Sequence, residues 1–132
     1  ETSVGVAVGY DVSADLSVGV YYASNDVAGD NYGASASYVM GAMAVDVYYD
    51  HVDLGDMEQF GFNASYAVSS DLTVYAGYFD ADGEIGADEG GYAGVVYAIN
   101  ENLSATVSFA EADEIDGPEF KDGTTVMLSA TF

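Results

Sequence analysis

The sequence contains no cysteine, tryptophan or arginine, and it has a single proline and a single lysine. Without cysteine, a disulfide scaffold, thiol catalysis and a cysteine-based zinc site are all excluded. No run of about 18 apolar residues occurs, which excludes a membrane-spanning helix. The 23 acidic residues face Lys121 as the only base, so the net charge is −22. A nucleic-acid partner is excluded because it requires a basic surface.

The acidity of the chain is combined with a high apolar content. Strongly acidic chains are often disordered, but disordered chains are poor in aromatic and β-branched residues. Here hydrophobic residues make up 50% of the chain and aromatic residues 14%. The acidic and the apolar residues must therefore occupy separate parts of a folded structure.

Apolar and small polar residues alternate with a period of two in nine segments, which is the pattern of β-strands. Residues 43–49 are typical, since Met43, Val45, Val47 and Tyr49 share one side of the segment. The nine segments are 3–10, 16–22, 34–40, 43–49, 60–66, 72–78, 93–99, 103–109 and 124–132. The seventh is the least regular. No amphipathic helix of useful length is found, so the sequence predicts an all-β fold.

The connections between these segments alternate in length. Short turns are followed by longer, acidic connections at about 24–31, 50–58, 80–90 and 111–123. In an up-and-down meander, successive connections lie at opposite ends of the sheet. We therefore expect all the acidic loops at one end, where they carry most of the 23 acidic residues.

The two faces of the predicted strands are suited to different surroundings, one to water and the other to lipid. The face opposite Val, Leu, Phe and Tyr carries Ser, Gly, Ala, Thr and Asn with almost no charge, whereas a soluble surface is about 25–35% charged. Such a face suits a water-filled lumen, and the apolar face ends in aromatic residues, as at membrane interfaces. The pattern predicts an antiparallel up-and-down transmembrane β-barrel. The residues expected to line its pore are Asp46, Asn63, Tyr21, Tyr48 and Tyr75.

The last segment ends in Phe132, and this terminal Phe resembles the C-terminal signature of bacterial outer-membrane barrels. Together with the succession of hairpins, it makes the chain similar to the general diffusion porins of Gram-negative bacteria, particularly the alphaproteobacterial kind. The resemblance implies a sixteen-stranded barrel that forms homotrimers and passes small hydrophilic solutes. It also implies a place in the bacterial outer membrane, surrounded by lipid bilayer and lipopolysaccharide.

The number of strands adds a further expectation. If Phe132 ends at the periplasmic side, the first of nine strands enters from outside, whereas a barrel of this kind starts and ends in the periplasm with an even strand number. The nine strands then resemble the last nine of sixteen. We expect residues 1–132 to be a single β-barrel segment, the C-terminal portion of a porin of roughly twice the length. Porins of this family oppose an arginine cluster to acidic residues, and nothing in this chain matches that cluster.

Two acidic segments have the composition of Ca²⁺ sites, because carboxylates at alternate positions can converge on a hard cation. The candidate ligands are Asp80, Asp82, Glu84, Asp113, Glu114 and Asp116. Neither segment has the full EF-hand spacing, and solvated acidic loops are the alternative. His51 lies between two aspartates and is expected to be an ordinary loop histidine.

No catalytic constellation is found, so the chain is not expected to be an enzyme. The leading function is a porin whose lumen-facing Asp46 and acidic mouth make it mildly cation-selective. One alternative is a small, complete outer-membrane barrel that serves as a non-conducting anchor or adhesin with acidic, cation-binding loops. A second is a soluble, acidic β-solenoid or surface-layer protein that binds Ca²⁺, which predicts a fixed repeat that is not found.

Overall fold

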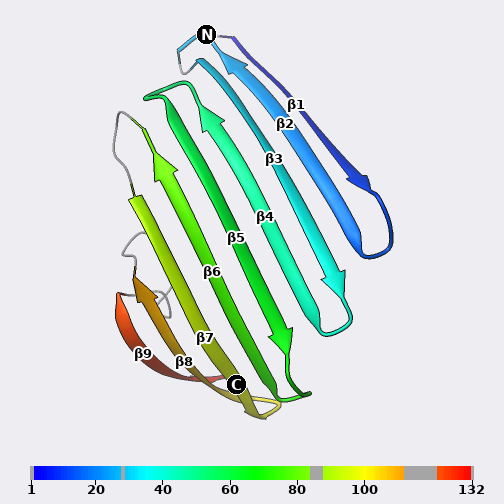
Figure 1. Cartoon of the computed structure of the whole chain (residues 1–132), viewed down its shortest axis with the longest axis vertical. Coiled ribbons are helices and arrows are strands. Elements are labelled where there is room, and N and C mark those ends of the chain that lie inside the picture. Colours follow the sequence, from blue (N-terminus) through cyan, green and yellow to red (C-terminus); the bar gives the residue numbers. More distant parts are fainter. Residues whose placement is uncertain (1, 28, 84–87, 112–121, 132) are drawn as a thin grey trace.

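The computed structural model describes residues 2–27, 29–83, 88–111 and 122–131 of the chain. They form one antiparallel sheet in which each strand pairs with its neighbour in the sequence (Figure 1). The strands are β1 (Ser3–Asp11), β2 (Leu16–Asn25), β3 (Gly29–Met40), β4 (Met43–Val52), β5 (Met57–Ala67), β6 (Leu72–Asp82), β7 (Asp88–Asn100), β8 (Leu103–Glu111) and β9 (Gly123–Ala130). The expected all-β, up-and-down architecture is confirmed.

Among the described residues, none belongs to a helix long and apolar enough to span a membrane.

The strands continue further into the acidic segments than the alternation of apolar residues predicts. β2 and β3 take up most of residues 24–31, β4 and β5 most of 50–58, and β6 and β7 most of 80–90. The prediction of long loops in these three segments was wrong. Acidic side chains do not interrupt the ladder, because they can face water while the backbone hydrogen bonds continue beneath them. Residues 112–121 of the fourth segment lie outside the described residues, as does Phe132.

The short turns at the opposite end are present as expected, and two of them repeat one sequence motif. The turn between β1 and β2 is Val-Ser-Ala-Asp-Leu, and the turn between β5 and β6 is Val-Ser-Ser-Asp-Leu. In each, the valine N–H donates to the leucine carbonyl at 2.8 Å. The serine hydroxyl also accepts the aspartate N–H, at 3.2 Å from Ser13 and 3.3 Å from Ser69. The local hydrogen bonds of serine thus close both hairpins.

The irregularity of the seventh segment has a structural cause. The pairing of β7 with β8 shifts its register between Ala98 and Asn100, which is a β-bulge. A bulge places one extra residue in one strand and interrupts the alternation of faces. The bulge accounts for the irregular alternation at the end of the seventh segment.

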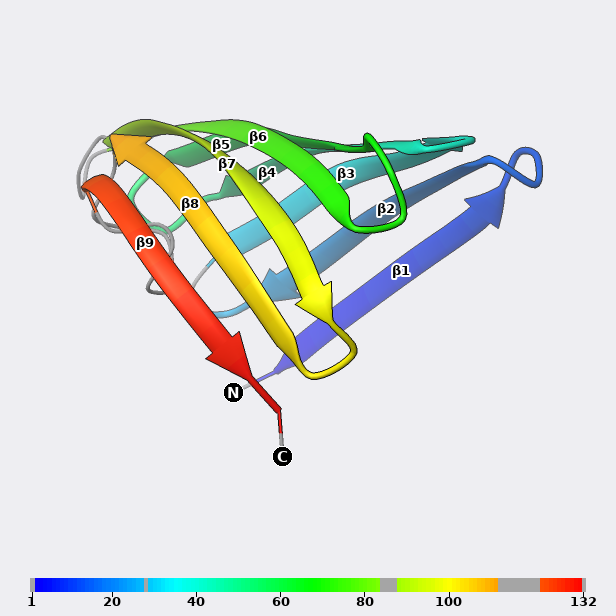
Figure 2. The same cartoon turned by 90° about the horizontal axis from the view of Figure 1, so that it is seen from below.

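The sheet is arched, with β1 and β9 as its two flanks (Figure 2). The strand register places all the buried residues among those described on one face, which we call the concave face. They are Gly33, Gly61, Gly77, Phe79, Gly90, Thr106, Ser108 and Ala110. Curvature crowds the side chains of this face together and leaves its small residues covered by their neighbours.

The opposite, convex face carries the large apolar side chains, and most of them are exposed. Val6 is 59% exposed, Val107 49% and Leu128 67%. A sheet that buries glycine and serine while exposing valine and leucine is turned inside out relative to a water-soluble protein. The convex face is therefore suited to contact with lipid, as the sequence predicts.

Two adjacent residues of β3 can test this assignment, because they lie on opposite faces of the sheet but at nearly the same depth in the membrane. We expect Ala36→Arg, on the convex face, to lower the free energy of unfolding in lipid by about 2–4 kcal/mol, because a charge there is placed in hydrocarbon. Ser35→Arg, on the concave face, is the matched control and should have a much smaller effect. Denaturant titration of the protein in vesicles measures both. Equal losses for the two variants would contradict the assignment.

Candidate functional site

The five residues predicted to line a pore all lie on the concave face. Asp46 on β4 is directly opposite Asn63 on β5, and Tyr48 follows Asp46 by two positions. The register places Tyr21 opposite Gly33 and Tyr75 opposite Gly94, which have the same orientation. The structure brings the five residues to one surface, and their role in a pore remains a prediction.

Tyrosines on this face lie over glycines of the neighbouring strand. A Cβ atom built on any of the four glycines would overlap the ring or the hydroxyl of the tyrosine paired with it, so the tyrosine occupies the space of the missing side chain. The four pairs are Tyr21 with Gly33, Tyr48 with Gly61, Tyr75 with Gly94 and Tyr92 with Gly77. Each tyrosine consequently extends over the neighbouring strand and covers the glycine there.

Two of these tyrosines reach across the glycine strand to a polar side chain on the strand beyond. The Tyr21 hydroxyl on β2 donates to Asp50 Oδ1 on β4 at 2.8 Å, passing over Gly33 on β3. The Tyr92 hydroxyl on β7 donates to Asn63 Oδ1 on β5, passing over β6 in the same way. We call each such arrangement a tyrosine strut, because it ties three adjacent strands together.

The third tyrosine is held by an amide. Gln59 on β5 donates through Nε2 to the Tyr48 hydroxyl at 3.2 Å. This bond fixes the ring of Tyr48 above Gly61, two positions along the same strand. Tyr21, Tyr92 and Tyr48 are thus oriented by hydrogen bonds with defined partners.

Asp46 is the central carboxylate of the concave face. Its Oδ1 accepts a hydrogen bond from the Ser37 hydroxyl on β3 at 2.5 Å. The donors to Asp46 and Asp50 are both neutral hydroxyls, so the two negative charges are not neutralised by these contacts. The sequence has no arginine, and Lys121, its one lysine, lies outside the described residues. The described wall is therefore electronegative.

Sequence reasoning missed Tyr92 and Asp50 on this face. The regular alternation of the seventh segment begins at Ala93, so Tyr92 lies just outside the predicted strand. Because Tyr92 directly precedes the apolar-side Ala93, the same alternation already places Tyr92 on the polar side. Asp50 was assigned to a loop, although it follows Asp46 and Tyr48 at intervals of two. Extending the alternation beyond both ends of each segment would have found both.

The convex face carries a second set of tyrosines at the acidic end of the sheet. Tyr49 donates its hydroxyl to Glu58 Oε1 at 3.0 Å, and Tyr78 donates to Glu89 Oε2 at 3.1 Å. Each ring thus has an apolar body beside the apolar surface and a polar tip directed at the acidic edge. Tyrosines take this arrangement at the boundary between lipid and water.

His51 belongs to this convex edge, and the expectation of an ordinary loop histidine was wrong. It lies in β4, where its ring stacks on Tyr32 at a centroid distance of 4.7 Å. Its Nε2 is 3.2 Å from Asp53 Oδ1, its Nδ1 is 3.8 Å from Glu58 Oε1, and the side chain is 13% exposed. The ladder continues past Tyr49, and this keeps His51 in the sheet.

Asp53 is held by the adjoining hairpin. Its Oδ2 accepts the backbone N–H of Asp30 at 3.0 Å, and its own N–H donates to the Asp30 carbonyl at 3.0 Å. The Asp30 N–H and, secondly, the hydrogen bond with His51 stabilise the ionised carboxylate and lower the pKa of Asp53 below its ordinary value of 3.8. Asp53 thus links the β2–β3 and β4–β5 hairpins at the acidic end.

The predicted Ca²⁺ ligands are only partly described. Asp80 and Asp82 lie on β6, directly opposite Glu89 and Glu58 respectively. Glu84, Asp113, Glu114 and Asp116 lie outside the described residues. Within the described ranges, no three acidic or histidine side chains come together as a metal site. Calcium binding therefore remains a prediction.

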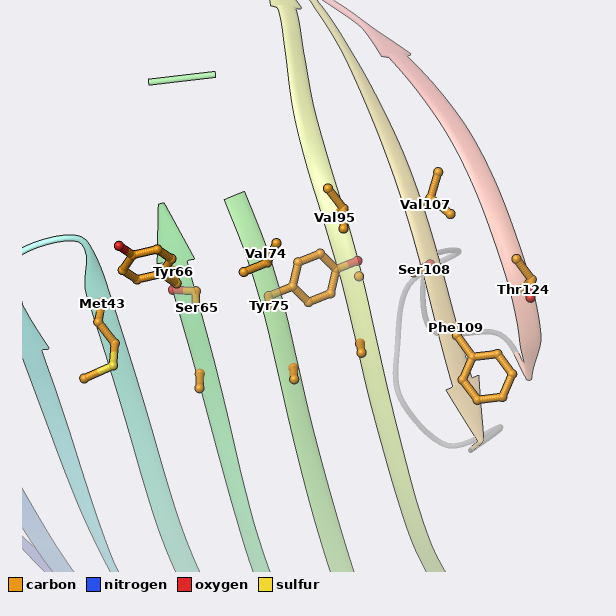
Figure 3. A pocket seen from close by; sticks show the side chains of 14 residues that line it. Met43, Ser65, Tyr66, Val74, Tyr75, Val95, Val107, Ser108, Phe109 and Thr124 are labelled. Atoms are coloured by element: carbon orange, nitrogen blue, oxygen red, sulfur yellow. The ribbon is translucent and has the colours of Figure 1, made fainter. Parts of the chain in front are cut away.

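A groove among the described residues lies on the convex face and is separate from the tyrosine struts. It has a volume of about 540 Å³, and Tyr66, Val74, Val95, Val107 and Phe109 are among the side chains around it (Figure 3). Its floor is a row of paired alanines, Ala64, Ala76 and Ala93. These walls are apolar and lack convergent polar groups, so the groove is not the candidate site.

Glycine variants test the tyrosine struts. We expect Gly77→Ala to lower the free energy of unfolding by about 1–3 kcal/mol, because the new methyl group must displace the Tyr92 ring that overlaps it. Gly9→Ala is the matched control on the same face, since a Cβ there has open space around it. Unfolding curves of the three proteins in one detergent measure the difference. A Gly77 variant as stable as the Gly9 variant would contradict the strut.

A pH series tests the link made by Asp53. Because the pKa of Asp53 is lowered in the folded state, its stabilising contribution is complete above about pH 3.8 and is lost as the pH falls through the folded-state pKa. Asp53→Asn should therefore be less stable than the native protein at pH 7, and the gap in stability should close as the pH falls below the folded-state pKa of Asp53. Asp56→Asn, in the same turn, controls for removal of a charge. Thermal unfolding across this range measures the gap, and a constant gap would contradict the link.

Comparison with known proteins agrees with this architecture. Residues 1–117 match the model of the Gram-negative porin family. Among solved structures, a chain described as "NanC porin structure in rhombohedral crystal form" has a TM-score of 0.59 at 10% identity, over 98% of this chain and 78% of that chain. At this identity the likeness concerns the fold alone. None of the curated proteins compared with the chain matches it. Since the family model covers most of its length, the chain belongs to the Gram-negative porin family and is a protein of the bacterial outer membrane.

Proposed function

We propose that the protein forms part of a water-filled channel for the passive diffusion of small hydrophilic solutes, with a mild preference for cations. Membership of the porin family and the porin-like fold support a channel. The observation that carries the preference for cations is the pair Asp46 and Asp50, which lie on the concave face and have neutral hydrogen-bond donors.

The electrostatic argument depends on what neutralises these carboxylates. Hydroxyl donors stabilise a carboxylate without cancelling its charge, so the compensating charge must come from mobile cations or from a base outside the described residues. A channel wall of one sign concentrates counter-ions and repels co-ions. The effect is screened by salt over about 10 Å at 0.1 M ionic strength, so the preference is modest.

The packing of the concave face favours a channel over a non-conducting anchor. A closed barrel of eight strands fills its interior with side chains. Here Gly33, Gly61, Gly77 and Gly94 accept the tyrosine rings against the wall, and the rings therefore take up little of the space inside. Small serines occupy other inward positions, such as Ser35 and Ser65.

The edges of the sheet support a larger barrel. β1 and β9 are the two ends of the described sheet, and each pairs with one neighbour. In a membrane every strand edge must be paired, because lipid offers no hydrogen bonds. We propose that further strands complete the barrel, in line with the sixteen strands that the sequence resemblance implies.

Reversal potentials in a gradient of KCl test the preference for cations. The reconstituted channel should prefer K⁺ over Cl⁻, and Asp46→Asn combined with Asp50→Asn should lower the permeability ratio about two- to fivefold, as expected for removing charges near the ion path. Asp71→Asn, in a turn at the other end, is the control. An anion-selective native channel would refute the preference, and absence of conductance would favour the anchor.

A further inference from the structure

We propose that the tyrosines and carboxylates of the concave face form a binding track for organic cations, meaning ammonium compounds with apolar substituents. The juxtaposition that carries this inference is of oriented tyrosine rings with Asp46 and Asp50 on one wall. The inference rests on the proposed channel function and narrows its solute class.

The first step concerns the faces of the rings. Tyr48 and Tyr92 each lie over a glycine at the position of a side chain, so one face of the ring rests on the neighbouring strand. Because these residues belong to the concave face, the side of each ring away from that strand is on the interior of the arch. Tyr21 is held in the same way and is 38% exposed. Aromatic faces carry negative potential and attract cations that lie over them.

The second step is the position of the carboxylates relative to the rings. One row of paired residues crosses β3 to β7, from Ser37 through Asp46, Asn63 and Gly77 to Tyr92. Tyr92 reaches back along this row to Asn63, and it interacts electrostatically with Asp46 and Tyr48. Its ring centroid is 6.1 Å from that of Tyr75. Aromatic faces and a carboxylate thus meet at the centre of the wall.

The third step is the continuation of this arrangement toward the acidic end. Asp50 and Tyr48 have the same orientation as Asp46 and follow it along β4 at intervals of two residues. Tyr21, bonded to Asp50, carries the pattern to β2. A cation that leaves Asp46 can therefore contact Tyr48 and then Asp50 along the same strand. Conduction requires such a series of several weak sites.

The combination of groups selects the class of solute. A compact ion such as K⁺ retains its water and gains chiefly from the carboxylates. A quaternary ammonium ion is weakly hydrated, so it can also lie against a tyrosine face, which is the established way in which proteins recognise such ions. Because hydrogen bonds to Asp50, Asn63 and Gln59 already hold the rings, little ordering is needed on binding.

Block of the potassium current by choline tests the inference on the whole protein reconstituted in planar bilayers. The neutral alcohol 3,3-dimethylbutan-1-ol has the shape of choline without its charge and is the matched probe. Choline should reduce the K⁺ current reversibly, and the alcohol should not. In Tyr48→Leu, which removes the aromatic face, the half-blocking concentration of choline should rise about two- to fivefold.

Two further variants separate the aromatic face from other effects. Tyr48→Phe keeps the ring and should retain a half-blocking concentration close to that of the native protein. Tyr66→Leu removes a tyrosine from the convex face, where it is 50% exposed, and should leave both the K⁺ current and the block unchanged.

The outcomes distinguish this inference from the channel proposal. If the native channel is cation-selective but choline blocks no better than the alcohol, the binding track is refuted and the channel stands. If Tyr48→Leu and Tyr48→Phe raise the half-blocking concentration of choline equally, the binding track is also refuted. Should Tyr48→Leu fail to fold, the comparison of choline with the alcohol on the native protein still decides. Absence of conductance refutes both proposals.

Discussion

The hydrogen-bond ladder joins all nine strands of the described sheet, with a shift of register at the β7–β8 bulge, and the other features of the structure follow from this ladder. Inside a bilayer each backbone N–H and C=O must be paired within the protein, so the register cannot slip locally without loss. Because the side-chain period is two, one register assigns every residue to the concave or the convex face. The buried glycines and serines, the exposed valines and the row from Ser37 to Tyr92 all follow from it.

Glycine determines the character of the concave face. Each of Gly33, Gly61, Gly77 and Gly94 leaves room for a tyrosine from the adjacent strand, and the tyrosine covers the glycine. The wall gains aromatic surface and hydrogen bonds across three strands, at Tyr21–Asp50 and Tyr92–Asn63, without losing interior space. Carboxylates held by neutral hydroxyls remain charged toward the lumen. Stabilisation of the sheet and the electrostatic character of the wall thus come from the same side chains.

The extent of each strand was harder to predict than its orientation. Apolar residues mark a strand only where one face touches lipid, and beyond the lipid both faces carry polar side chains. Asp50 and His51 lie in that outer region, and for this reason they were assigned to loops although both are in β4. Tyr92 was missed because Gly91 supplies no apolar side chain to the convex face, so the alternation of the seventh segment is recognisable only from Ala93 onward. The backbone ladder continues through all these positions because acids and histidine do not prevent strand pairing.

The number of strands, their up-and-down order and their two faces could be predicted from the sequence, because a period of two with apolar residues on one side has a single solution in lipid. The sequence also placed Asp46, Asn63, Tyr21, Tyr48 and Tyr75 on one face. Which tyrosine covers which glycine, and which carboxylate it binds, depends on the tertiary structure. Those contacts join residues on different strands, such as Tyr21 and Asp50, whose meeting depends on the stagger of the hairpins between them. The stagger of the hairpins cannot be predicted from the composition of the chain or from the spacing of its residues.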